Sequence, residues 1–254
     1  MDWLPVPSVF YSLLKRAAKW MVPKRYHGAL ADTASRITGY RVESYSQQGE
    51  DVILRILFEG VERGFYVDVG AYHPVRYSNT YYFYKRGWHG INIDATPGAV
   101  EVFNRYRRRD INLEAAVAKN KRDITLFMFK QGGLNTLSPE LAELHSRQST
   151  RRVISSKVVR TQSLLEILDT YKAPGQEIDF LSVDVEGYDL EALQSNDWKK
   201  YVPKVVLCED LTVTTLEEVG KSEVCRFLRG EGYALFSKCF HTLIFTHASF
   251  RNNR

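Results

Sequence analysis

The sequence predicts a doubly wound α/β domain, in which helices cover a mostly parallel seven-stranded sheet with an antiparallel hairpin at its C-terminal end. Three observations lead to this fold class. Short apolar runs without polar alternation, typical of strands buried on both faces of a sheet, recur along the chain. Segments with helically spaced apolar residues separate these runs. Two further β-prone runs lie close together near the end of the chain.

The run FYVDV at residues 65–69 is the predicted central strand, because it is apolar and β-prone and leads into a glycine turn. The segment before it, 44–59, contains a helix with Glu50 and Asp51 at its start, where acidic side chains favour the helix dipole, and Gly60 ends it. Ligands of doubly wound folds bind outside the carboxyl ends of the strands. We therefore expect the site at the end of this strand.

The remaining elements alternate along the chain. We expect strands at 90–94, 111–118, 123–129, 178–187, 204–210, 233–237 and 242–247. We expect helices at 80–86, from Pro97 to the arginine run at 105–109, at 163–171, from 190 onward and at 216–228. The stretch 139–157 is polar and basic without a strong period, and we predict a mobile excursion there. The last two strands should form an antiparallel hairpin at the sheet edge.

The composition is that of an ordinary folded chain. Of 254 residues, 44% are hydrophobic and 26% are charged, which excludes a disordered or fibrous protein. A net charge of +5 favours anionic partners without choosing among nucleic acid, acidic lipid and a phosphate-bearing substrate. No apolar run approaches the length that spans a membrane. Cys208, Cys225 and Cys239 are far apart in apolar contexts, so we predict free, buried thiols and a cytoplasmic protein.

Residues 1–40 are predicted to be a separate amphipathic and basic segment, followed by the folded domain at 41–254. From Val9 to Met21 apolar residues recur at helical spacing, with basic residues between them. Two interpretations stay open. Residues 1–30 could pack on their own domain or on a second copy of the chain, or they could lie on the inner face of an anionic membrane.

The ends of the first two strands carry the residues that suit a nucleoside cofactor. Asp68, Gly70 and Ala71 end the strand 65–69, where glycine and a small neighbour allow a ligand to come close. Asp94 ends the next strand and can accept both hydroxyls of a ribose. NAD and S-adenosylmethionine both fit this description. Because residues 71–74 lack the later glycines of a pyrophosphate-binding turn, the sequence favours S-adenosylmethionine.

Acidic residues also end the strands at 178–187 and 204–210. Asp184, Glu186 and Glu209 are the candidate catalytic residues, because clustered carboxylates can act as a general base or hold a divalent cation. The presence of a metal stays open. The alternative is that such acids cap the following helices, as Asp210 could. Weaker candidates for the base are His73, His89 and His241.

Several long motifs together resemble one known family. YSQQGEDVIL, GFYVDVGAYHPVRYSNTYYFYKRGWHGINIDATPG, EIDFLSVDVEGYDLEAL and VPKVVLCED, from about Tyr45 to Asp210, are similar to the FkbM-type methyltransferases. The resemblance implies a Rossmann-like class I S-adenosylmethionine-dependent O-methyltransferase, whose relatives commonly act on sugars or polyketide-type hydroxyls. Of these we expect a hydroxyl of a sugar or glycan precursor, as in cell-surface polysaccharides. It also implies that Asp68, Gly70 and Asp94 bind the cofactor and that Gln47 reaches its amino-acid end. His73-Pro74 replaces the later glycines of the usual methyltransferase turn.

Two other functions remain as alternatives. A nucleic-acid methyltransferase could use the arginines of 105–109 and of 147–160 as phosphate contacts. However, DVEGY differs from the Asn/Asp-Pro-Pro-aromatic pattern of enzymes that methylate base nitrogens, so we do not expect a nucleic-acid partner. A non-catalytic docking protein with the same fold is the other alternative. The acids at three strand ends argue against it.

Overall fold

The computed structural model describes residues 23, 42–148 and 150–251. The chain divides into two units, Met1–Ser44 and Tyr45–Arg254, and the second contains the elements described below. Apart from residue 23, the amphipathic segment predicted at 1–40 lies outside the described residues, as do its predicted contacts. In the part of the chain that the structure describes, no helix combines the length and the apolar character needed to cross a bilayer.

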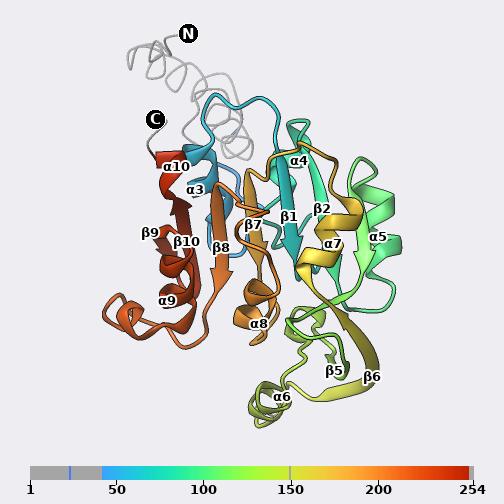
Figure 1. Cartoon of the computed structure of the whole chain (residues 1–254). Helices are drawn as coiled ribbons and strands as arrows, with labels where there is room; N and C mark the ends of the chain where they lie inside the picture. Colours follow the sequence, from blue (N-terminus) through green and yellow to red (C-terminus); the bar gives the residue numbers. More distant parts are fainter. Residues whose placement is uncertain (1–22, 24–41, 149, 252–254) are drawn as a thin grey trace. The chain divides into compact units, whose positions relative to one another are not determined.

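The core of the second unit is a seven-stranded sheet of order β3-β2-β1-β7-β8-β10-β9 (Figure 1). Its strands are β1 (Phe65–Val69), β2 (His89–Asp94), β3 (Ile111–Glu114), β7 (Phe180–Val183), β8 (Val205–Glu209), β9 (Tyr233–Cys239) and β10 (Thr242–His247). The first five strands of this order are parallel, and β10 pairs antiparallel with both β8 and β9. The predicted fold class and C-terminal hairpin are confirmed. The chain leaves β1 towards β3 and returns at β7, so the switch point lies between β1 and β7.

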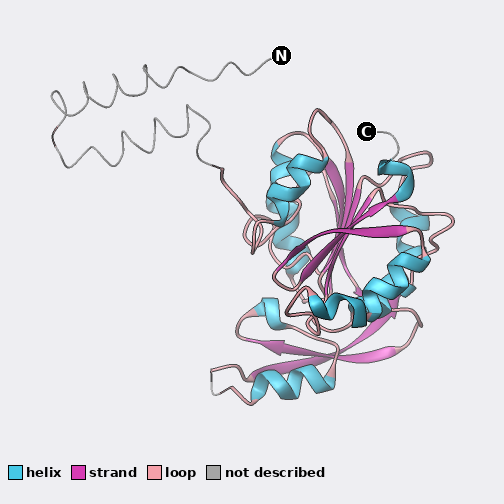
Figure 2. Cartoon of the chain, turned by 90° about the vertical axis from the view of Figure 1, so that its left-hand side faces the viewer, coloured by secondary structure: helices cyan, strands magenta, loops and turns pink. Residues whose placement is uncertain are grey.

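Helices cover both faces of this sheet (Figure 2). On one face, α7 (Leu164–Tyr171), α8 (Asp189–Gln194) and α9 (Glu223–Gly230) pack against residues such as Val67 and Leu181. On the other, α3 (Glu50–Leu57) and α4 (Tyr81–Lys85) pack against Tyr66 and Phe180. The remaining helices are α5 (Ala99–Tyr106), which contacts β2 and β3, and the short α10 (Ala248–Arg251). Because both faces are buried, β1 and β7 show no polar alternation.

A second, smaller sheet follows β3 and projects beyond the carboxyl ends of the main strands (Figure 1). It consists of β4 (Ala116–Val117), β6 (Val153–Gln162) and β5 (Asp123–Phe129), with η2 (Gly132–Leu134) and α6 (Pro139–Ser146) between β5 and β6. The prediction of a mobile excursion at 139–157 is wrong. Ser138 caps α6 by accepting a hydrogen bond from the Leu141 amide, and β6 pairs along β5.

Three predicted elements end differently in the structure. The strand expected at 111–118 divides between the two sheets as β3 and β4. The strand expected at 178–187 ends at Val183, because the chain turns there and Glu186 has a left-handed φ of 49°. The helix expected at 216–228 divides into η3 (Glu217–Lys221) and α9, because Ser222 caps the second part by accepting from the Cys225 amide. The three cysteines are free, and two of them are fully buried.

Candidate active site

A cavity of about 490 Å³ opens at the carboxyl ends of β1, β2 and β7, at the switch point of the main sheet. This volume lies in the ~300–1,000 Å³ range of small-molecule sites. The smaller sheet contributes one wall, through Leu126 and residues 131–135 and 137. Of the predicted excursion at 139–157, Arg151 also lines this cavity.

The turn after β1 is built around Gly70, which has a φ of 83°. A Cβ there would lie 1.7 Å from the Asp184 carbonyl oxygen, so the close approach that requires glycine is made by the chain itself. The amides of Gly70 and Ala71 donate to the Ile93 carbonyl at 2.8 and 3.1 Å. These contacts join the ends of β1, β2 and β7.

Asp94 lies at the end of β2, half-buried in the cavity wall. Its Oδ2 accepts from the Tyr72 amide at 2.8 Å and its Oδ1 from the Thr96 amide at 2.7 Å. Each carboxylate oxygen has a second lone pair, so both remain able to accept from a ligand. The two backbone contacts fix the direction in which this carboxylate points.

The predicted site residues fall into three groups. The cavity is lined by Gln47, Gly70, Asp94, Asp184 and Glu186. Glu209 lines a small adjoining cavity together with Gln47 and Asp184. Asp68 and Ala71 are buried beside the site and are absent from the described lining of the main cavity. Their predicted part in cofactor binding would therefore be indirect.

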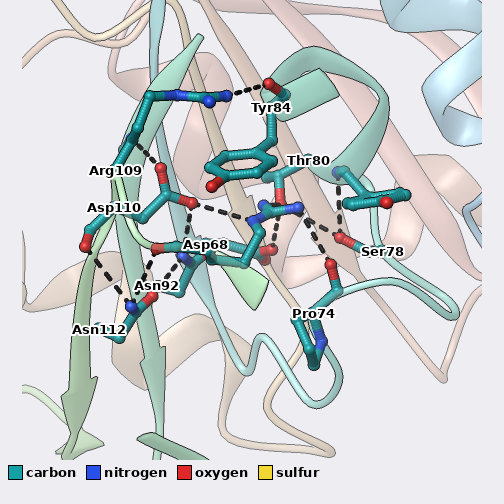
Figure 3. Close-up of polar contacts among 12 residues, drawn as sticks. Asp68, Pro74, Ser78, Thr80, Tyr84, Asn92, Arg109, Asp110 and Asn112 are labelled. Carbon is teal, nitrogen blue, oxygen red and sulfur yellow. Dashed lines mark hydrogen bonds and ion pairs between the residues drawn. The ribbon is translucent and has the colours of Figure 1, made fainter. Parts of the chain in front are cut away.

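Asp68 belongs to a buried polar network under the loop 71–80 (Figure 3). Arg107, which is 0% exposed, donates to Asp110 at 3.0 Å and to the Pro74 carbonyl at 3.1 Å, and also to Thr80. Thr80 in turn donates to Asp68 at 3.1 Å. Arg107 thus ties the end of α5 to the loop that follows β1.

Burial raises the pKa of Asp68 to about 6, against the opposing effects of Arg107 and of the Thr80 hydrogen bond. Between about pH 4 and this value the folded chain holds a proton that the unfolded chain has released, so the free energy of unfolding falls as the pH rises. The change from 3.8 to about 6 corresponds to ~3 kcal/mol. Between about pH 4 and about pH 8, the free energy of unfolding of the wild type should therefore fall by ~3 kcal/mol relative to that of Asp68→Asn. Denaturant unfolding of both proteins at several pH values measures this difference. A pH-independent difference between the two proteins would contradict it.

Three carboxyl groups meet where β7 and β8 end. Carboxylate oxygens of Asp184, Glu186 and Glu209 lie within 4.8 Å of one another. Burial raises the pKa of Glu186 to about 8, with further contributions from Asp184 and Asp189. Burial and the neighbouring acids also raise the pKa of Asp184 and Glu209. Such a cluster holds protons at neutral pH and can accept or relay one, or it can bind a cation.

The acids around this cluster have structural roles. Asp189 accepts from the amides of Val185 and Gly187, both at 3.0 Å, and so shapes the turn after β7. Asp210 accepts from the Thr212 amide and from the Ser222 hydroxyl, which agrees with the capping alternative for this residue. The Nδ1 atom of His73 accepts from two amides of its own loop. His73 therefore serves the turn.

Sequence reasoning missed His145, which lies on α6, and considered Arg151 only as one of the possible phosphate contacts at 147–160. His145 Nε2 lies 3.6 Å from Glu186 Oε2, and Arg151 lines the cavity. Tyr72 and Tyr77 also line it, with their rings stacked at 6.3 Å and with positive φ angles of 51° and 55°. No burial pattern in the sequence marks this side of the cavity, because β6 is exposed along most of its length.

The sequence matches the model of the methyltransferase FkbM domain over residues 68–235. The chain belongs to this FkbM family. A search of curated proteins gives no match. Among solved structures, an O-methyltransferase from Bacillus cereus, crystallised with SAH, is 12% identical, with a TM-score of 0.36 over 92% of this chain and 96% of that one. No residue is carried over from that structure.

As an FkbM methyltransferase, the protein uses S-adenosylmethionine as its cofactor. The residues around the cavity fit this donor. A carboxylate and an amide, Asp94 and Gln47, provide polar contacts, while the alanine- and valine-rich end of β3 and β4 provides an apolar surface for a purine. The assignment of single residues to single contacts stays a prediction.

Proposed function

We propose that this FkbM methyltransferase transfers a methyl group to a hydroxyl of a sugar or glycan precursor, and that it works in the cytoplasm. The observation that carries the proposal is that one cavity is lined by Asp94 at the end of β2 and by Asp184 and Glu186 after β7. The candidate ribose-binding acid and the candidate base thus line the same cavity. Methyl transfer to a hydroxyl is helped by a base that removes the hydroxyl proton beside the bound donor.

The donor would be held by Asp94 at its ribose and by Gln47 at its amino-acid end, with Ala115, Ala116 and Val117 against its adenine. When bound, it supplies an activated methyl group on a sulfonium. The chain's own task is then to orient the acceptor and to remove its proton.

Asp184 is the proposed base. Its backbone is held between β1 and β7, because its amide donates to the Val69 carbonyl at 2.9 Å. Burial and the adjacent acids Glu50 and Asp94 raise its pKa, which brings a carboxylate closer to the basicity that a hydroxyl proton requires. Glu186 and Glu209 are the neighbours that could share this proton.

A sugar is the proposed acceptor because the cavity combines aromatic and polar surfaces. The Tyr72 ring packs over Gly132 and Gly133, where added Cβ atoms would be 3.5 and 3.6 Å away, and Tyr77 stacks beside it. Aromatic faces with polar neighbours suit the apolar face and hydroxyl rim of a pyranose. The test is the mass of cellular glycans with and without this protein. An unchanged glycan fraction, with methylation found on another small molecule, would contradict the sugar.

Replacing Asp94 with alanine should weaken the binding of S-adenosylmethionine by about tenfold or more, because charge-assisted hydrogen bonds to the ribose would be lost. Calorimetric titration measures this. Asp123→Ala is the matched control, since Asp123 is an exposed acid that pairs with Arg160 at the surface. Unchanged affinity in a folded Asp94→Ala protein would remove Asp94 from the donor site.

Two arginines of the run at 105–109 argue against the nucleic-acid alternative. Arg107 is buried in the network described above, and Arg109 lies 4.0 Å over the Tyr84 ring and donates to its carbonyl. These two side chains are occupied by intramolecular contacts and do not form a phosphate-binding surface. The roles of residues 1–30 at a membrane or in a dimer, and the non-catalytic docking function, stay untested hypotheses.

A further inference from the structure

Arg151, in the turn between α6 and β6, lines the cavity from the side of the smaller sheet. Its side chain is half-buried, whereas that of the adjacent Arg152 is exposed. The Arg151 amide donates to the Gln148 carbonyl at 2.9 Å, which shapes the turn that presents the residue. The cavity wall on the side of the smaller sheet therefore carries a positively charged side chain.

The guanidinium of Arg151 has no partner within the part of the chain that the structure describes: it makes no hydrogen bond, ion pair or ring contact there. More exposed arginines on α6 and β6 do pair, Arg147 with Glu143 and Arg160 with Asp123, each at 3.0 Å. A guanidinium presents five donors in a rigid fork. These donors are available to a ligand in the cavity that supplies acceptor oxygens.

The nearby carboxylate does not fill this role. Burial raises the pKa of Glu186, and the positive charge of Arg151 opposes part of that rise. The two side chains therefore interact electrostatically. Glu186 nevertheless faces His145, at 3.6 Å, and forms no ion pair with Arg151 in the described chain. The cavity wall thus carries a guanidinium that these carboxyl groups leave without a hydrogen bond or ion pair.

We propose that the acceptor is an acidic sugar, whose carboxylate or phosphate binds Arg151; this rests on the function proposed above. An arginine fork matches both oxyanions with paired hydrogen bonds. The attraction of this acidic group to Arg151 would orient the sugar in the cavity. The hydroxyl end then faces Asp184. The positive charge of Arg151 thereby selects an anionic acceptor and fixes the direction in which it binds.

Calorimetry of the full-length protein, saturated with S-adenosylhomocysteine, tests this with three probes: glucuronate, glucose 1-phosphate and glucose. We expect the wild type to bind at least one anionic sugar about tenfold more tightly than glucose. Arg151→Gln should abolish that preference, and Arg152→Gln, one residue away on the exposed side, should keep it. The comparison of glucuronate with glucose 1-phosphate shows whether Arg151 prefers a carboxylate or a phosphate.

Equal binding of charged and neutral sugars by the wild type, or no binding of either anion, overturns the proposal. So does an Arg151→Gln protein that loses affinity for S-adenosylhomocysteine but keeps the anion preference, since Arg151 would then serve the donor's carboxylate. If S-adenosylhomocysteine fails to bind the wild type, the proposed function fails. In that case the three sugars are titrated into the protein without S-adenosylhomocysteine. The proposal about Arg151 then still requires that the wild type prefers an anionic sugar and that Arg151→Gln loses this preference.

Discussion

Replacing Arg107 with methionine should lower the free energy of unfolding by about 3–5 kcal/mol, the usual cost of removing one partner from a buried ion pair. Asp110, which is 9% exposed, would keep its hydrogen bonds from Tyr66 and Asn92 at 2.6 and 2.9 Å but lose its counter-charge. The Pro74 carbonyl and Thr80 would also lose a donor. Denaturant unfolding followed by circular dichroism measures the change.

Two variants separate this cause from a general effect of losing an arginine. Arg108→Met alters the next residue, which is exposed, and should change stability by no more than about 0.5 kcal/mol. Arg107→Met combined with Asp110→Asn removes both charges and should recover part of the loss. Equal losses in Arg107→Met and Arg108→Met would show that the buried network does not stabilise the fold.

The main sheet could be predicted from the sequence because burial leaves a pattern. Both faces of β1 and β7 are covered, so Phe65–Val69 and Phe180–Val183 consist mainly of apolar residues, and their runs mark the two sides of the switch point. Asp94 followed from the same logic, since the end of a buried strand is one of the few places where an acid can reach a ligand.

The smaller sheet could not be predicted in the same way, because β6 is exposed along most of its length and lacks a burial pattern. Arg107 illustrates a second limit. It stands in a run of arginines that favours a solvated helix end, yet its partners Tyr66 and Thr80 are distant in sequence. Local composition cannot reveal which arginine of a run will be buried. The reason for glycine at position 70 is likewise not visible in the local sequence, because the backbone that comes close to Gly70 belongs to Asp184.

Replacing Asp184 with asparagine should lower turnover by about 10²–10⁴-fold, the usual contribution of a general base, while donor affinity is retained. Asparagine keeps the shape of the side chain but cannot take the hydroxyl proton. The expected loss is in kcat, because the proton moves only in the transition state. Methyl transfer from labelled S-adenosylmethionine to a glycan fraction measures turnover. Glu223→Gln, an exposed acid on α9, is the control and should be fully active.

The close approach of Asp184, Glu186 and Glu209, within 4.8 Å, leaves a second mechanism to be separated in the same experiment. If Asp184 acts alone, a chelator should not affect the wild type, and Glu209→Gln should be far less damaging than Asp184→Asn. If the three carboxylates instead share a divalent cation that positions the acceptor, chelation should abolish activity and Glu209→Gln should match Asp184→Asn. A loss well below 10²-fold in Asp184→Asn would contradict both mechanisms, because each depends on this carboxylate. His145 beside Glu186 would then be the next residue to replace.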